Sequence, residues 1–316
     1  MGELKAALAR CRTDWLICAV SCVAVFILCE ATALWVLLDS FGMGLRKGTT
    51  FFTACIGFFF SAITPSSTGG QPMEVYYLRK KGIPVSVSSA ILLVMAAAYK
   101  LVLSVVGLGL LIIAPGFLKA HLGGMMFLYY IGLALTAGLT ALLFLFLFRP
   151  GIARGILIGG MTVLEELHLL KDREIRQRSL EMSMDVYSDA SEHLRKCPGV
   201  LLEVLGIMLL RRLALFSVTW CVYRALGLSG SGWWSIILLQ ASISVSADML
   251  PLPGGMGVSE GLFIKAFGAV FGAAVLPGMV LSRGIGHYSQ LILCAAVSLT
   301  AIALLRRRHK EDEYES

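Results

Sequence analysis

The stretch Leu250-Pro-Leu-Pro-Gly-Gly-Met-Gly-Val-Ser-Glu260 interrupts a long apolar run with prolines, glycines and one carboxylate. An earlier stretch, Thr64-Pro-Ser-Ser-Thr-Gly-Gly-Gln-Pro-Met-Glu74, interrupts another apolar run in the same way. When the earlier stretch is moved along the chain by 186 positions (251 − 65), it overlays the later one without a gap. Both stretches, with the residues that follow them, match the pattern P-x3-G-x4-E-x4-[R/K]-x2-G. Because the matching residues are those least expected in lipid, we interpret the pattern as an internal repeat. The matched pairs are Pro65 and Pro251, Gly69 and Gly255, Glu74 and Glu260, Arg79 and Lys265, and Gly82 and Gly268.

The composition predicts a membrane protein. Of the 316 residues, 57% are hydrophobic and only 15% are charged, which is too apolar for an ordinary soluble domain. Several apolar runs reach the roughly 20 residues that a helix needs to cross about 30 Å of hydrocarbon. These runs are continuous, not alternating, so we predict an all-α polytopic helix bundle and not a β-barrel. The net charge of +7 comes mostly from basic residues at segment ends, a pattern typical of membrane topology and not of nucleic-acid binding.

The sequence lacks the usual signatures of soluble enzymes and of metal sites. It has no Walker loop, no dinucleotide-binding fingerprint, no H-E-x-x-H and no G-x-S-x-G. Its eight cysteines are scattered and form no C-x-x-C, although Cys11, Cys18, Cys22 and Cys29 share one helical face, which we interpret as a helix contact. We therefore expect no cofactor, no metal and no catalytic residue, and a transporter in preference to an enzyme.

The apolar runs divide the chain into two halves. We predict continuous spans at about 15–38, 84–114, 124–148, 199–226 and 275–304, and Pro/Gly-broken helix pairs at about 49–81 and 233–272. The expected organisation is a first transmembrane repeat plus an extra span (1–148), charged amphipathic cytoplasmic linker helices (149–198), a second repeat (199–305) and a basic and acidic cytoplasmic tail (306–316).

Two topologies are compatible with this pattern. If both broken pairs are re-entrant, the extra span inverts the second repeat, and the basic residues Lys5, Arg10 and Arg12 lie outside the cell. If the first broken pair crosses the membrane completely, the N-terminus lies inside and the two repeats are no longer equivalent. The repeat favours the first topology, and Lys/Arg counting favours the second.

The two breaks are the first candidate sites. Non-helical backbone at membrane depth must be packed in protein or line a wet cavity, because each unpaired backbone group costs several kcal/mol in lipid. Each break precedes a helix start, where free N–H groups and the helix dipole favour an anion such as phosphate. We therefore expect a phosphate near Gly69-Gly70 and near Gly254-Gly255; the alternative is a tightly packed helix break without a ligand.

Charged residues inside the spans are the second group of candidates, because such residues are expensive in lipid and commonly mark a functional path. Glu74 and Glu260 are each expected to pair with a cation of the following span, Lys100 and Arg283 respectively, either to bind a ligand or to lock the bundle. Arg211 and Arg212 lie mid-span and need an anionic ligand or an acidic partner. The partners considered are Asp248, Glu30 and Glu203.

The last span carries a polar stripe. Arg283, His287 and Gln290 follow one another at i, i+4 and i+7, so they share a helical face. A histidine in this setting is more often a packing residue than a proton relay. The complete set of predicted substrate-binding residues is Gly69, Gly70, Glu74, Lys100, Arg211, Arg212, Asp248, Gly254, Gly255, Glu260, Arg283 and His287.

At the two breaks the sequence resembles the lysylphosphatidylglycerol synthase/flippase-like integral membrane family. Leu250–Glu260 resembles the family signature P-x-P-G-G-x-G-x-x-E, and residues 64–72 with Tyr76-Tyr-Leu-Arg-Lys-Lys-Gly82 resemble its first signature. Arg283 matches an arginine of the family's last long span, and the resemblance covers about 15–305. The sequence departs from the family at Ala97-Ala-Tyr-Lys100, where an acidic residue with an arginine is expected.

The resemblance implies a lipid flippase. In the multiple-peptide-resistance proteins of this family, the implied role is to move aminoacylated phosphatidylglycerol between leaflets of the bacterial cell membrane. Those proteins carry an additional soluble aminoacyl-transferase domain, which these 316 residues do not contain, so we do not expect this chain to make the lipid alone. The alternatives are a secondary transporter of a small ion or metabolite, or a membrane partner of a lysyltransferase. The expected partners are a phospholipid substrate and the membrane, with a homodimer and a separate aminoacyl-transferase as candidates.

Overall fold

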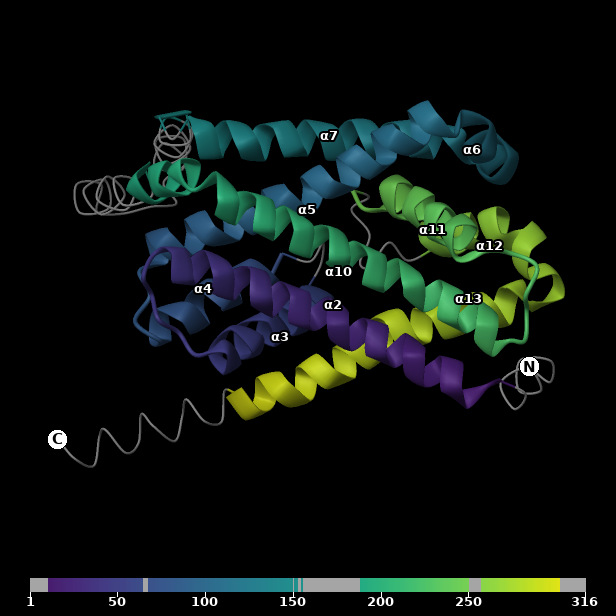
Figure 1. Cartoon of the computed structure of the whole chain (residues 1–316), viewed down its shortest axis with the longest axis horizontal. Coiled ribbons are helices and arrows are strands. Elements are labelled where there is room, and N and C mark those ends of the chain that lie inside the picture. The colour runs from purple at the N-terminus through teal and green to yellow at the C-terminus, as the bar shows by residue number, and fades with distance from the viewer. Residues whose placement is uncertain are drawn as a thin grey trace, which may run out of the picture.

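Two long antiparallel helices, α2 (Thr13–Ser40) and α10 (Pro198–Ala225), lie side by side across the centre of the protein (Figure 1). The computed structural model describes residues 11–64, 68–149, 151–152, 155, 188–249 and 257–301. The Arg12 N–H, just before α2, donates a hydrogen bond to the Ala225 carbonyl at the end of α10 (2.9 Å). Side chains at mid-helix are paired as well, so the contact runs along most of both helices.

The remaining helices pack around this pair, and the described residues contain no strand. In the first half they are α3 (Lys47–Ile63), α4 (Gly70–Lys80), α5 (Val85–Ile113), α6 (Pro115–Leu122), the short η2 (Gly123–Met125) and α7 (Met126–Phe148). In the second half they are α11 (Trp233–Ala247), α12 (Val258–Phe271), the short η4 (Gly272–Ala274), α13 (Val275–Arg283) and the π-helix η5 (Gly284–Ser289), after which residues 290–301 continue as α-helix.

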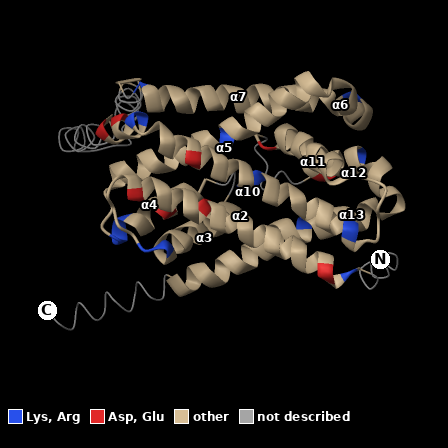
Figure 2. Ribbon diagram, viewed as in Figure 1, with Lys and Arg blue, Asp and Glu red and all other residues tan. Residues whose placement is uncertain are grey.

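The helices confirm the prediction of an all-α, multi-pass membrane protein. Four helical stretches are long and apolar enough to cross a membrane: Thr13–Ser40, Val85–Ile113, Pro115–Phe148 and Val258–Ala301. Helix α10 is as long as α2 but carries Arg211 and Arg212 near its middle. Charged residues lie mainly toward the two ends of the bundle, with a small group near its centre (Figure 2).

Close helix contacts use small residues, as expected where lipid tails remove the hydrophobic driving force between helices. A Cβ added to Gly132 of α7 would overlap the Val245 carbonyl of α11, so these backbones touch. Nearby, the buried Tyr129 hydroxyl donates a hydrogen bond to the Gly107 carbonyl of α5 (2.7 Å). Packing of this kind holds α5, α7 and α11 together beside the central pair.

Both predicted breaks separate two helices that contact each other, α3 from α4 and α11 from α12. At the first break, the Thr64 side chain bridges the gap between the two helices, because its Oγ1 accepts a hydrogen bond from the Gly69 N–H just before α4 (2.9 Å). A Cβ at Gly70 would overlap the Ser61 hydroxyl and come within 2.7 Å of the Gly57 carbonyl. The start of α4 therefore packs directly on α3. That the two halves are repeats with re-entrant helices stays a prediction.

The charged linker predicted at 149–198 lies mostly outside the described residues. Residues 188–196 are helical and contact the bundle through His193, whose Nε2 lies 2.8 Å from the Ser40 carbonyl at the end of α2. The exposed Lys196 ammonium, 2.6 Å from Glu192 and one turn away, lowers the pKa of that carboxyl. The predicted tail at 306–316 also lies outside the described residues.

Candidate functional site

A cavity of about 830 Å³ lies at the centre of the bundle, and both breaks contribute to its wall. Ser61, Thr64 and Glu74 line it from the first broken pair, and Asp248 and Ser259 line it from the second. Helices α2, α5, α10 and the last span complete the wall. The described flanks of both breaks therefore adjoin a polar cavity, which is one of the two alternatives expected for non-helical backbone at membrane depth.

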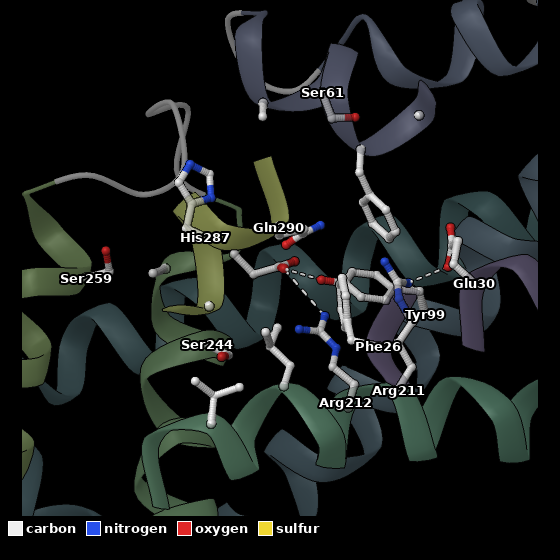
Figure 3. A pocket seen from close by; sticks show the side chains of 18 of the residues that line it. Phe26, Glu30, Ser61, Tyr99, Arg211, Arg212, Ser244, Ser259, His287 and Gln290 are labelled. Atoms are coloured by element: carbon white, nitrogen blue, oxygen red, sulfur yellow. Dashed lines mark hydrogen bonds and ion pairs between the residues drawn. The ribbon is translucent and has the colours of Figure 1, made fainter. Parts of the chain in front are cut away.

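Arg211 and Arg212 project from α10 into this cavity, and both are buried, with exposed fractions of 7% and 3% (Figure 3). The Arg211 Nη1 lies 3.0 Å from the Glu30 Oε2, so an acidic residue of α2 balances it. The Nη2 of Arg212 lies 3.5 Å from the Asp248 Oδ1. Two of the three acidic partners considered for these arginines are thus in place, whereas Glu203 is exposed.

The ring of Tyr99 of α5 packs against the guanidinium groups of both arginines. Its ring centroid lies 3.7 Å from the Arg212 Cζ and 4.7 Å from the Arg211 Cζ. An aromatic face attracts a desolvated guanidinium by about 2 kcal/mol, which helps to hold both charges away from water. Even so, the Nε atoms of both arginines are buried and without a hydrogen-bond partner among the described residues.

Asp248 is shared by two cations. Asp248 lies where α11 ends. Its carboxylate forms ion pairs with Lys100 of α5 and with Arg212, and it accepts a hydrogen bond from the Tyr99 hydroxyl (3.4 Å). The prediction that Lys100 pairs with Glu74 is therefore wrong, because Lys100 forms its ion pair with Asp248 at the end of α11. One carboxylate against two cations leaves this end of the cavity with an excess of positive charge.

Glu74 is the opposite case. It is 7% exposed and lines the cavity, yet it has no ion pair in the part of the chain that the structure describes. Its carboxyl group lies against α3 at Gly57, where a Cβ would clash with it. A carboxyl group facing a cavity without its own cation is suited to a ligand that carries a positive group.

The second matched carboxylate does pair as predicted. The Oε1 of Glu260 lies 3.5 Å from the Nε of Arg283, and Arg283 also contacts the Ser259 hydroxyl. In addition, Glu260 accepts a hydrogen bond from the Gly257 N–H and so caps its own helix, α12. The two repeat positions therefore differ in environment: Glu260 is paired and capping, whereas Glu74 is not.

The predicted polar stripe is confirmed, because Arg283, His287 and Gln290 all line the cavity. Figure 3 shows His287 and Gln290 on the last span, across from α10, with the His287 ring pointing away from the two arginines. His287 belongs to the π-helix η5, and such single-turn π segments occur frequently at functional sites.

The glycines of the first break do not line an open phosphate-binding site, which differs from the expectation of a phosphate near Gly69-Gly70. Gly69 is bonded to Thr64 and Gly70 is packed on α3, so the first break fits the alternative of a tightly packed helix break. Gly254 and Gly255 lie outside the described residues. The sequence alone does not identify Tyr99 and Gly57 as site residues. For Tyr99 a signal was available, because it stands next to Lys100 in an apolar run.

Apolar helices around a cavity that is lined by charges of both signs define a multi-pass membrane protein with a polar site among its helices. The chain belongs to the lysylphosphatidylglycerol synthase transmembrane-region family, whose family model matches residues 1–294. The match confirms the resemblance carried by the two Pro/Gly stretches. A comparison with curated proteins gave no match.

Proposed function

We propose that the chain is a lipid flippase of the bacterial cell membrane, which moves a phospholipid with a phosphate and a cationic headgroup between leaflets. Aminoacylated phosphatidylglycerol is a lipid of this kind, and membership of the lysylphosphatidylglycerol synthase family supports it as the substrate. The observation that carries the proposal is the separation of charges within one cavity: excess positive charge near Asp248, and at Glu74 a carboxyl group that has no ion pair among the described residues.

The lipid phosphate binds at Lys100 and Arg212. Both cations already share one carboxylate, so a second anion between them meets positive charge that is only partly neutralised. Charge-assisted hydrogen bonds to phosphate oxygens are about twice as strong as neutral ones. The guanidinium of Arg212 offers a planar donor fork that matches the phosphate group.

The cationic aminoacyl group binds at Glu74, on the wall formed by α3 and α4. The Glu74 carboxyl lies against Gly57, and among the described residues it forms no ion pair that would compete with the ligand. The acyl chains remain in lipid, because only the headgroup needs to avoid hydrocarbon. No ATP site is expected from the sequence, so the movement is passive, exchange-driven or coupled to an ion.

The family also supports a role beside lysylphosphatidylglycerol synthesis. A separate aminoacyl-transferase would deliver the lysylated lipid in one leaflet, and this chain would transfer it to the other. Co-purification of such an enzyme with the full chain from its native membrane would support the partnership.

Proteoliposomes with headgroup-labelled lipids test the proposal. Phosphatidylglycerol, its lysyl form and a zwitterionic lipid are compared by their accessibility to an impermeant quencher added outside. Wild type should expose inner-leaflet lysylated lipid faster than protein-free liposomes do, and Lys100→Gln should slow it. Lys119→Gln is the matched control, because Lys119 is an exposed residue of α6 outside the cavity.

If no lipid moves faster than in protein-free liposomes, the flippase proposal is refuted. Ion-gradient-driven uptake of small anions would then test the alternative of a secondary transporter, which the same cavity charges could serve.

A further inference from the structure

Three cysteine side chains converge at one end of the central helix pair. The sulfur atoms of Cys18, Cys22 and Cys221 all lie within 4.8 Å of one another, and those of Cys18 and Cys221 are 3.4 Å apart. Cys18 and Cys22 are one turn apart on α2, and Cys221 comes from the neighbouring turn of the antiparallel α10. The sequence could not show this group, because its third member lies about 200 residues away from the other two.

The spacing of the three sulfur atoms suits a metal ion. An ion about 2.3 Å from each of three coplanar sulfurs separates them by about 4 Å, that is √3 × 2.3. The Cys18–Cys221 separation of 3.4 Å and the 4.8 Å limit for the whole group are close to this value, so small rotations of the thiols are enough to surround an ion. Cys221 is buried, whereas Cys18 and Cys22 are partly exposed, which leaves a way in.

The donor set favours a soft ion. Thiolates select Cu(I), zinc and iron–sulfur clusters, and structural zinc sites almost always take four protein ligands. Among the described residues, no fourth histidine, cysteine or carboxylate joins this group. Three sulfurs without a fourth ligand match the low coordination numbers that Cu(I) accepts.

The surroundings fit a bound thiolate–metal unit. The cluster lies near the start of α2 and the end of α10, so its charge is closer to the membrane surface than to the bundle centre. Two basic residues, Arg12 and Arg224, lie at the same end, and Arg224 lies over the Trp15 ring at 5.5 Å. Trp15 and Trp220 pack together beside the thiols in the same hydrophobic cluster.

We propose that Cys18, Cys22 and Cys221 form a binding site for a soft metal ion, with Cu(I) as the preferred ion. As each sulfur–copper bond forms, the thiol gives up its proton to water, so binding releases protons and weakens as the pH falls. The bound ion ties α2 to α10. These two helices carry Glu30 and Arg211, so the metal would brace the helix pair that forms one wall of the cavity.

Anaerobic titration of the full-length, reduced protein in detergent with Cu(I) tests the site. A chromophoric Cu(I) chelator serves as competitor, and thiolate-to-copper charge-transfer absorption reports the ligands. Wild type should retain one copper per chain. Cys18→Ser, Cys22→Ser and Cys221→Ser should each weaken retention at least tenfold and reduce the absorption.

The control is a second thiol pair. Cys55 and Cys294 contact each other in the same hydrophobic cluster, but in the part of the chain that the structure describes no third thiol joins them, so Cys294→Ser should leave copper retention unchanged. Because Cys221 is buried, folding of each variant is checked by its melting temperature without metal; Cys18→Ser and Cys22→Ser, at partly exposed positions, carry the test if Cys221→Ser does not fold.

The proposal is overturned if wild type loses all copper to the chelator. It is also overturned if Cys294→Ser weakens retention as much as the three cluster substitutions do, since binding would then be adventitious thiol chemistry. None of these readouts depends on lipid transport, so the metal site can fail while the flippase proposal stands.

Discussion

The Arg211 guanidinium lies 3.0 Å from the Glu30 carboxylate, and this pair joins the middle of α10 to the middle of α2. Both side chains are largely buried, with exposed fractions of 9% and 15%. The Arg211 Cζ also lies 4.6 Å from the Phe26 ring of α2. The pair therefore fixes the register of the two central helices and at the same time presents a balanced charge to the cavity.

Glu30→Gln should destabilise the protein by about 3–5 kcal/mol, because it leaves a buried arginine without its counter-charge. The free energy of unfolding in mixed micelles measures the change. The double variant Glu30→Gln/Arg211→Met should recover much of the loss, since no unpaired charge remains. Equal stability of the single variant and wild type would show that the pair does not hold the helices.

Lys100→Gln should slow lipid transfer about tenfold or more, equivalent to about 1.4 kcal/mol in the barrier, for every lipid that carries a phosphate. Folding should be preserved, because Asp248 keeps Arg212 as its partner. Initial rates in the proteoliposome assay provide the measurement, with Lys119→Gln as the charge-matched control. A rate equal to that of wild type would remove Lys100 from the phosphate site.

Glu74→Gln should affect selectivity more than stability. Among the described residues Glu74 has no ion pair to lose, so the melting temperature should change little. The ratio of transfer rates for lysylated over unmodified phosphatidylglycerol should fall about tenfold, since the ammonium loses its counter-charge. If both lipids slow equally, Glu74 does not recognise the cationic group.

Gly70→Ala should cost about 1–3 kcal/mol of stability, because its methyl group would overlap the Ser61 hydroxyl of α3. Gly138→Ala in α7 is the matched control: nothing lies within 4 Å of its added Cβ, and alanine favours a helix by about 0.5–1 kcal/mol. Comparing the two unfolding free energies isolates the close packing at the first break. A stable Gly70→Ala would mean that α4 can move away from α3.

Local sequence signals were sufficient for most of the long helices, but they did not predict the short helix α6 at Pro115–Leu122. Apolar runs and prolines placed the spans within a few residues of their observed ends; for example, 84–114 was expected and Val85–Ile113 is found. The same holds for the polar stripe of Arg283 and His287, since both lie on one helix and their spacing determines the face.

Partners across helices were harder to predict. The sequence pairs Lys100 with Glu74, because Lys100 lies in the span that follows the broken helix pair of Glu74. In the structure, α5 brings Lys100 to Asp248 at the end of α11 instead. Sequence periodicity describes the faces of one helix and carries no information on which helix lies opposite. The role of Gly57, and the convergence of Cys221 with Cys18, depend on the same unseen adjacency.

The carboxylate of Asp248 also serves as a built-in counter-ion for the cations beside it. Lys100 and Arg212 are neutralised in part by a group of the protein itself, so the vacant site is not a pair of bare charges inside the bilayer. On the proposed function, an arriving phosphate competes with this built-in counter-ion and leaves when the counter-ion returns. Such competition weakens lipid binding. A carrier that must release its lipid in the opposite leaflet turns over faster when the lipid is weakly bound.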